Sequence, residues 1–275
     1  MSLYLVVFIF LCYLALTKCI FYRHGKTLRK SLKLVLNVSS SRDTDGADIR
    51  ALLVTAHPDD ECMFFAPTII RLVELNASVH LLCLSEGNYY NQGDQRRQEL
   101  LNSCAVLGIP ASRITIVDHK KLPDDPKAEW SISLVSSTIV KHIRAHSFNM
   151  VLTFDERGVS GHANHTAIHK AVSEPLTTLT ADWVSLSSPP DCCLLSLVTV
   201  GLLRKYISIL ELPLSWLLPS CLCCIIGSRG YRRAAMLCHR TQLLWFRYLY
   251  ITFSRYMFVN TFQIIPQGPK NLKIY

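Results

Sequence analysis

The segment Thr55-Ala56-His57-Pro58-Asp59-Asp60-Glu61 decides how the rest of this 275-residue chain is organised. It places one imidazole and three carboxylates within five residues, directly after the apolar run Ala51-Leu52-Leu53-Val54. Adjacent carboxylates repel one another unless a proton or a cation lies between them, and histidine with aspartate is an ordinary ligand set for Zn²⁺. The segment therefore predicts a site for Zn²⁺, or another divalent metal, at the end of a buried strand.

Short apolar runs alternate with helical stretches from this segment onward. Near-continuous apolar runs are typical of parallel strands that are buried on both faces. We therefore expect a Rossmann-like, three-layer α/β domain with a mostly parallel sheet, preceded by an N-terminal transmembrane helix. The expected strands are 51–55, 79–84, 114–117, 150–154 and 194–200, and the expected helices are 63–75, 94–107, 130–146 and 164–172.

The loops that follow the expected strands carry most of the polar side chains. They read HPDDE, SEGNYYNQGDQ, DHKKLPDD and FDERGVSGHANH. Ligands of open α/β sheets collect at the carboxyl ends of the strands, so these loops should converge on one edge. The last of them supplies His162 and His165, which are three residues apart and can provide one metal ligand and one nearby proton donor.

His57 and Asp60 are also three residues apart, so both side chains can reach one ion. Asp59 then points elsewhere and can accept a proton from a water activated by the metal. The chain has no H-E-x-x-H motif to supply that base from a helix. Another interpretation is that Asp59 or Asp60 caps the following helix, which is compatible with metal binding. His169 lies a turn beyond His165 and could point towards the site, but it is expected to be an ordinary surface or packing histidine.

Residues 3–22 are apolar except for Lys18 and are long enough to span a bilayer. Basic residues follow at once, so the positive-inside rule places the body of the protein in the cytoplasm. A cleaved signal peptide is the alternative interpretation. A signal peptide has its basic residues before the apolar stretch, whereas here they follow it, and no clear small-x-small cleavage site precedes Arg23.

The net charge of +9 is divided unevenly along the chain. Residues 18–42 hold seven basic and no acidic residues, and the chain from Arg204 holds ten basic residues and only Glu211, whereas the segment between them is net −7. A nucleic-acid binder would carry its basic residues on the domain that holds the site, so no nucleic-acid partner is expected. Positive ends suit contact with an anionic membrane.

We divide the chain into an anchor (1–22), a basic and polar linker (23–48), a catalytic domain (49–257) and a tail (258–275). The basic, aromatic stretch from Thr241 has the composition of a helix lying in the bilayer interface, and equally that of a helix packed on the sheet. The run 212–227 is interrupted by Pro213 and Pro219, so a second span is not expected there.

The pairing of AHPDDE with a later GHxxH on this fold resembles the LmbE/PIG-L family of zinc-dependent de-N-acetylases. Further matches are SEGNYYNQG, RRQEL, LGIP, TFDERGVSGHANH, LRKYIS and HRTQLLWFR, which extend the resemblance over roughly residues 50–257. The resemblance implies that His57, Asp60 and His165 ligate the metal and that Asp59 is the general base. It also implies that His162 polarises the acetyl carbonyl or protonates the leaving amine.

Arg96 matches a family arginine near the phosphate or inositol of the substrate. Soluble relatives often have aspartate where this chain has Asn164, so Asp155 is a candidate partner for His162. The anchor and HRTQLLWFR together resemble members that deacetylate the glycolipid N-acetylglucosaminyl-phosphatidylinositol, the second step of GPI-anchor synthesis, on the cytoplasmic face of the endoplasmic reticulum. A deacetylase of a soluble amino-sugar conjugate and a catalytically inactive membrane scaffold are the alternatives.

Overall fold

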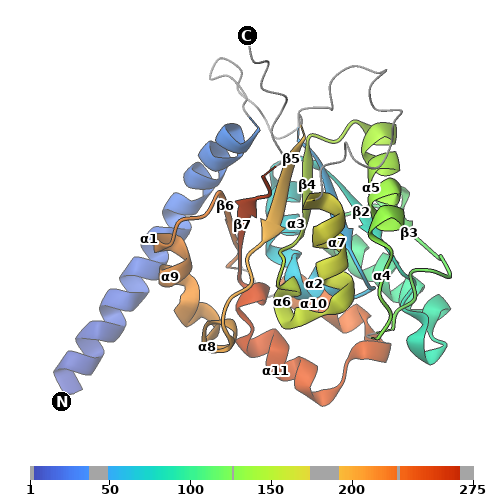
Figure 1. The fold of residues 1–275 in the computed structure, drawn as a ribbon. Helices are drawn as coiled ribbons and strands as arrows, with labels where there is room; N and C mark the ends of the chain where they lie inside the picture. Colours follow the sequence, from blue (N-terminus) through green and yellow to red (C-terminus); the bar gives the residue numbers. More distant parts are fainter. Residues whose placement is uncertain (1–2, 37–48, 126, 174–191, 228–229, 267–275) are drawn as a thin grey trace, which may run out of the picture.

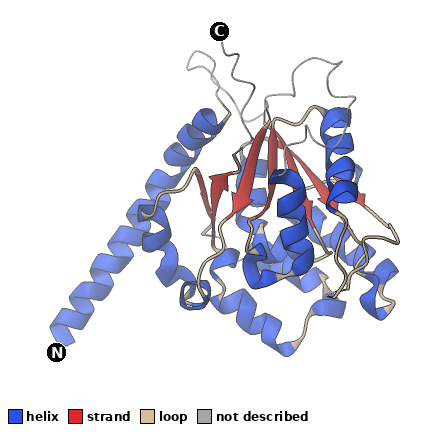
Figure 2. Ribbon diagram, in the orientation of Figure 1, coloured by secondary structure: helices blue, strands red, loops and turns tan. Residues whose placement is uncertain are grey.

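The centre of the molecule is a seven-stranded sheet with the order β3-β2-β1-β4-β5-β7-β6 (Figures 1 and 2). The computed structural model describes residues 3–36, 49–125, 127–173, 192–227 and 230–266. All five expected strands are present, and each pairs in parallel with its neighbours from β3 to β5. The strands are β1 (Arg50–Thr55), β2 (Ser78–Cys83), β3 (Ile114–Ile116), β4 (Met150–Phe154), β5 (Cys193–Leu197), β6 (Leu222–Ile225) and β7 (Val259–Ile264).

The sheet is covered on both faces, as expected for a three-layer domain. Helices α5 and α7 pack together on one face, and α3, α4 and α10 lie on the other (Figure 1). This enclosure explains the apolar strands, since all five residues of β4 are buried. The helices that follow the anchor are α2 (Asp60–Phe64), α3 (Ala66–Glu74), α4 (Gly93–Leu107), α5 (Ile132–His146), α6 (Gly158–Gly161), α7 (Ala163–Ser173), α8 (Leu202–Tyr206), α9 (Leu212–Leu217), α10 (Gly230–Cys238) and α11 (Trp245–Phe253).

The expected helix over 63–75 is divided into α2 and α3. Pro67 occupies the first turn of α3, where its missing N–H leaves no hydrogen bond unmade. Because α2 starts at Asp60 rather than Met63, the acidic residues of the central segment belong to its first turn. The helix therefore directs their carboxylates at the carboxyl end of β1.

The N-terminal helix α1 runs without a break from Leu3 to Val35. The helix thus continues past residue 22, the predicted end of the anchor, and through residues 23–35, where a linker is predicted; residues 37–48 lie outside the described part. The helix continues because one stripe packs on the domain, burying Thr17, Ile20, His24, Leu28 and Leu32. Among the described residues α1 is the one helix long and apolar enough to cross a membrane.

The C-terminal residues complete the sheet. β7 lies between β5 and β6 and is antiparallel to both, so the predicted tail boundary at 258 is wrong. Val259 and Phe262 are fully buried, which accounts for this strand's place inside the sheet. The run 212–227 forms the short helix α9 and strand β6, in agreement with the expectation that it makes no second span.

Candidate active site

In the turn between β1 and α2, Asp60 is held by hydrogen bonds, whereas Asp59 has a strained backbone. Asp60 Oδ2 accepts hydrogen bonds from the backbone N–H groups of Ala56 and His57, both at 2.9 Å. Asp59 makes no capping hydrogen bond and has a φ of 123°, a conformation that L-residues rarely adopt. Strained residues of this kind cluster at functional sites. The capping interpretation is therefore wrong for Asp59.

The segment that carries His162 and His165 follows β4, and its backbone conformation requires glycine at position 158. Gly158 has a φ of 55°, and a Cβ atom there would lie 2.9 Å from Cβ of His165. His165 Nδ1 lies 3.0 Å from the carbonyl oxygen of Gly158, which assigns the ring proton to Nδ1 and leaves Nε2 as the ligand atom. Phe154 stacks on the same ring, with centroids 3.8 Å apart. Backbone and aromatic contacts thus fix the orientation of His165.

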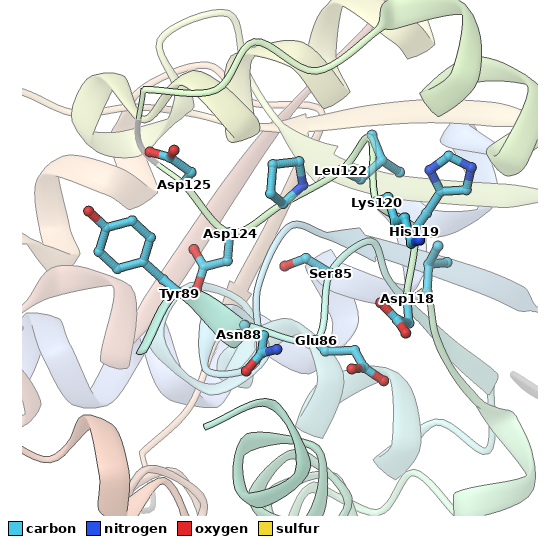
Figure 3. Close-up of a pocket in the computed structure, with 13 residues that line it drawn as sticks. Ser85, Glu86, Asn88, Tyr89, Asp118, His119, Lys120, Leu122, Asp124 and Asp125 are labelled. Carbon is cyan, nitrogen blue, oxygen red and sulfur yellow. The ribbon is translucent and has the colours of Figure 1, made fainter. Parts of the chain in front are cut away.

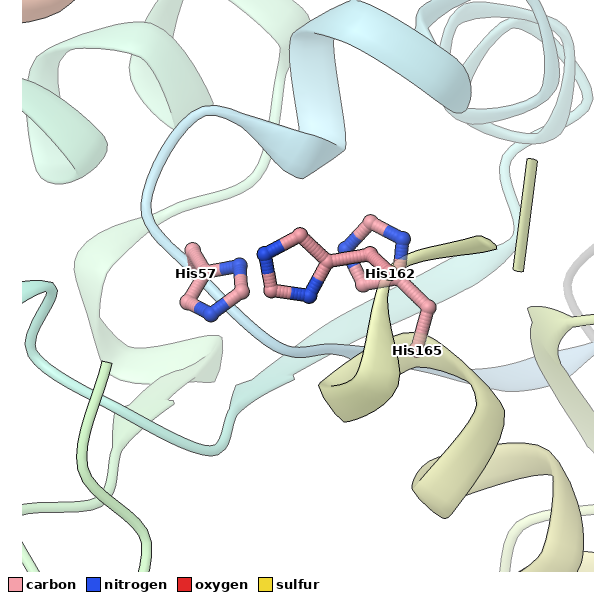
Figure 4. A group of neighbouring side chains, drawn as sticks. All are labelled: His57, His162 and His165. Atoms are coloured by element: carbon pink, nitrogen blue, oxygen red, sulfur yellow. The ribbon is translucent and has the colours of Figure 1, made fainter. Parts of the chain in front are cut away.

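These two segments meet at one point. The imidazoles of His57, His162 and His165 each offer a nitrogen within 4.8 Å of the others (Figure 4). Asp60 joins them: its Oδ1 lies 3.2 Å from Nε2 of His165, and its Oδ2 lies 3.9 Å from Nδ1 of His57. The structure therefore brings together all three predicted metal ligands, with His162 beside them.

The chemistry of these donors fits a divalent cation. Nε2 of His165 is buried and makes no hydrogen bond of acceptable geometry among the described residues, although Asp60 is close. Burial lowers the pKa of His57 to about 4, so its imidazole is neutral and able to ligate. Burial alone would raise the pKa of Asp60, but its contacts with the rings of His165 and His57 and its hydrogen bonds hold this pKa below its usual range. A buried carboxylate beside two imidazoles is the kind of set that Zn²⁺ binds.

Asp59 has the electrostatic properties of a general base. Burial raises its pKa to about 6, and the neighbouring Asp60 adds to this effect, while Arg247 and Arg96 oppose it. Its two oxygens lie 3.3 Å from Nη2 of Arg247 and 4.0 Å from Nη2 of Arg96. A carboxylate that titrates near neutrality can both take and return a proton.

Arg96 lies at the site but is enclosed by protein. Its side chain is 6% exposed and donates hydrogen bonds to the carbonyl oxygens of Gly87 (3.0 Å) and Pro58 (2.7 Å). It also pairs with Asp124 Oδ2 at 2.7 Å. Through these contacts Arg96 holds the loops after β1, β2 and β3 together; its predicted contact with the substrate stays a prediction.

Asp124 is a site residue that sequence reasoning missed. Its Oδ1 lies 3.1 Å from Nε2 of His57, so this carboxylate bridges His57 and Arg96. It comes from the DHKKLPDD loop after β3, and its position at a strand's carboxyl end was the one available signal. The loop also borders a pocket of about 340 Å³ whose lining includes Glu86, Asp118 and Asp125 (Figure 3).

Asp155 does not partner His162 in the described structure. Its oxygens accept hydrogen bonds from the backbone N–H and the hydroxyl of Thr199, both at 2.6 Å, and from the N–H of Arg157 at 3.1 Å. The Thr199 hydroxyl in turn accepts from the N–H of Val159 at 2.9 Å. Asp155 therefore braces the histidine loop against the end of β5.

Two further side chains, Asn164 and His169, lie next to the histidines of the site. The side-chain amide of Asn164 lies 3.0 Å from Nε2 of His57, so this side chain contacts His57 rather than His162. His169 Nδ1 lies 3.1 Å from the carbonyl oxygen of Phe154, which agrees with its predicted packing role.

The C-terminal segment also reaches the site. His239 pairs with Glu61, and Arg247 with Asp59, although both come from the HRTQLLWFR segment far along the chain. The sequence marked this segment as a family motif without indicating a contact. Glu61, Cys62 and His239 also form a cluster of possible metal ligands, in which Glu61 Oε1 is already engaged by Ser103 and by Nε2 of His239, while Nδ1 of His239 is buried without a partner among the described residues.

The fold and the site together define a Rossmann-like hydrolase with a candidate metal centre at the carboxyl ends of β1 and β4. The family model described as PIG-L, GlcNAc-PI de-N-acetylase, matches residues 52–176, and the chain belongs to this family.

Two relatives and one solved structure illustrate the relationship. The N-acetylglucosaminyl-phosphatidylinositol de-N-acetylase of Bos taurus is 48% identical over 80% of this chain and 85% of its own length. A probable enzyme of the same name from Schizosaccharomyces pombe is 32% identical over 82% of this chain and 90% of its own. The N,N'-diacetylchitobiose deacetylase from Pyrococcus horikoshii superposes with a TM-score of 0.56 at 17% identity, covering 91% of this chain and 96% of that one, which confirms the fold.

Proposed function

We propose that this protein removes the acetyl group from N-acetylglucosaminyl-phosphatidylinositol, giving glucosaminyl-phosphatidylinositol and acetate, the second step of GPI-anchor synthesis. The observation that carries the proposal is the convergence of His57, Asp60 and His165 beside the strained Asp59. The names of the relatives supply the substrate.

The proposed chemistry is amide hydrolysis by an activated water. His57, Asp60 and His165 would hold a divalent cation, which we propose to be Zn²⁺. When bound, the cation supplies a Lewis acid that polarises the acetyl carbonyl and makes a water more acidic. Asp59 accepts a proton from the attacking water as the new C–O bond forms. The C–N bond then breaks, and the amine takes a proton from His162, whose ring lies 4.8 Å from that of His57.

The electrostatics of His162 suit this role. Burial lowers its pKa, and the charge of His165 adds to the effect. When protonated, the ring is a stronger acid for the leaving amine; when neutral, it can polarise the acetyl carbonyl instead. The polar pocket beside Asp124 has the acceptors to receive sugar hydroxyl groups.

We further propose that the protein is held in the endoplasmic reticulum membrane by α1, with the catalytic domain in the cytoplasm. The basic residues after the apolar half of α1 support this orientation. The burial of Thr17 and Ile20 against the domain argues against removal of residues 1–22 as a signal peptide, since cleavage would take away part of a packed helix.

The function is tested by acetate release from N-acetylglucosaminyl-phosphatidylinositol by membranes that carry the protein. Chelation should abolish release, and Zn²⁺ should restore it. His165→Ala should also abolish release, and His146→Gln, on the exposed end of α5, is its matched control. Activity only on water-soluble amino-sugar conjugates would favour that alternative substrate class. Absence of both metal binding and activity would favour an inactive scaffold.

A further inference from the structure

Three helices in the C-terminal part of the chain, after the histidine segment, together expose an apolar face. Helices α8, α9 and α11 contact one another directly or through the short turn 208–211. On them Leu203, Leu217 and Trp245 are 78%, 77% and 75% exposed. Single exposed apolar residues are ordinary, but a connected group of them marks an interaction surface or a membrane contact.

This face is continuous with the candidate membrane span. The hydroxyl of Tyr13 in α1 donates a hydrogen bond of 2.7 Å to the carbonyl oxygen of Ile209, and Ile20 packs with Leu212. The apolar N-terminal part of α1 then leaves the domain on the side where α8 and α11 lie (Figure 1). A bilayer that takes up this part of α1 therefore meets the same face of the domain.

A pocket of about 480 Å³ opens between α2, α8 and α11. Its walls are mostly apolar, with Phe64, Phe246 and Phe253 among them, yet it contains Lys205 and Arg247. Burial lowers the pKa of Lys205, and no carboxylate pairs with its ammonium group among the described residues.

Arg247 is only partly satisfied. Its Nε has no partner within the described residues, and one Nη donates to the sulfur of Met63, a weak acceptor. Its other Nη contacts Asp59 at 3.3 Å, so the guanidinium joins the pocket to the proposed base. The charges of Lys205 and Arg247 in a mostly apolar pocket provide a site for an anion that carries apolar chains.

We propose that Lys205 and Arg247 bind the phosphodiester of a membrane glycolipid in this pocket, while the apolar face of α8, α9 and α11 lies in the bilayer interface. The inference rests on the proposed function for the identity of the substrate. Cations bind phosphate through charge-assisted hydrogen bonds, which are stronger than neutral ones. The sugar and inositol rings separate the phosphate from the amide, which lets the amide reach the site beyond Arg247 while the lipid tails stay in the membrane.

The phosphate contact is tested with the full-length protein in liposomes. Lys205→Gln should raise KM for N-acetylglucosaminyl-phosphatidylinositol by about tenfold or more relative to its effect on phosphate-free N-acetylglucosaminyl-inositol. Lys141→Gln, an exposed lysine on α5, should change neither value. Equal losses on the two substrates would overturn the phosphate site. An inactive wild type would instead overturn the proposed function together with this site.

The membrane contact has a readout that does not require activity. Lipids brominated near the headgroup should quench part of the tryptophan fluorescence of the wild type, because exposed Trp245 would lie at that depth. Trp245→Phe should lose that part of the quenching and keep the same fold by circular dichroism. Identical quenching of the two proteins would overturn the proposed seat in the bilayer.

Discussion

Nε2 of His239 lies 2.7 Å from Oε1 of Glu61, and neither side chain has any exposed area, although 178 residues separate them. The second oxygen of Glu61 accepts a hydrogen bond of 3.0 Å from the N–H of Asp59. The pair therefore connects the C-terminal segment to the strained turn that carries the proposed base. Support of this kind keeps a reactive group in one position.

Removing His239 alone should destabilise the protein strongly. His239→Leu leaves the Glu61 carboxylate buried without its charge partner, and breaking such pairs costs about 3–5 kcal/mol. The double variant Glu61→Leu/His239→Leu should recover part of this loss, because it leaves no unpaired charge. Denaturant unfolding in detergent measures both. A single variant as stable as the wild type would show that the pair contributes no stability.

The same pair predicts a pH window for stability. Burial would raise the pKa of Glu61, but the charge and hydrogen bond of His239 lower it; burial would lower the pKa of His239, but Glu61 raises it. The Glu61 contribution is present above its unfolded pKa of 4.5 and is lost as the pH falls through the lower folded value. The His239 contribution is present below 6.5 and is lost as the pH rises through the higher folded value.

The stability difference between the wild type and the double variant should consequently be largest between pH 4.5 and 6.5 and decline on either side. Thermal melts over a pH series measure this difference. A difference that stays constant with pH would mean that the pair is not ionised.

Asp59→Asn should separate catalysis from metal binding. The amide cannot accept the proton of the attacking water, so kcat should fall by about 10²- to 10⁴-fold while the metal is retained. His165→Ala should lose the metal, since it removes a ligand atom that lies 3.2 Å from Asp60. Acetate release and metal content by mass spectrometry distinguish the two. Loss of metal from Asp59→Asn would instead make Asp59 a ligand.

Asp124→Asn should weaken metal binding without removing a proposed ligand. The carboxylate contacts Nε2 of His57 at 3.1 Å and Arg96 at 2.7 Å, so its loss frees the orientation of a ligand ring. Partners that orient ligands are commonly worth about 10- to 100-fold in metal affinity. Competition with a chelator measures the change. The neighbouring Asp125→Asn is the control, and equal effects at the two positions would remove the special role of Asp124.

Thr199→Val should lower kcat by loosening the histidine loop. It removes the hydroxyl that joins Asp155 to the N–H of Val159, and an unpaired buried group costs about 1–3 kcal/mol. Thr199→Ser keeps the hydroxyl and should behave like the wild type. Initial-rate kinetics compare the three proteins. If Thr199→Val keeps the kcat of the wild type, the hydroxyl does not support the loop; a loss in Thr199→Ser alone would assign the support to the methyl group.

The first half of the fold follows from local features of the sequence. His57, Asp60 and His165 could be placed together because each lies just after a strand whose apolar run is unambiguous. β6 and β7 escaped prediction because they are short and antiparallel, and their burial depends on α1 and the strands beside them. Periodicity does not report such neighbours.

The hydrogen-bond partners of charged side chains were harder to predict than the set of residues that lie in the site. Spacing along the chain suggested Asp155 for His162, but Thr199 had already occupied both oxygens. The contacts of Asp124 and His239 cross long stretches of sequence, so no local pattern indicated them. Residue type and strand position predicted which groups share the site, whereas the hydrogen-bond partners of these groups could be identified only from the three-dimensional structure.

The place of β7 between β5 and β6 also bears on how the protein is made. Ribosomes release a chain from its N-terminus, so α1 is available to a membrane long before Val259–Ile264 has been synthesised. Until that strand arrives, β5 and β6 have no partner on their facing edges. A nascent chain stalled or truncated before residue 259 would contain the whole of α1 but would expose open strand edges, which makes it a substrate for chaperones and quality control.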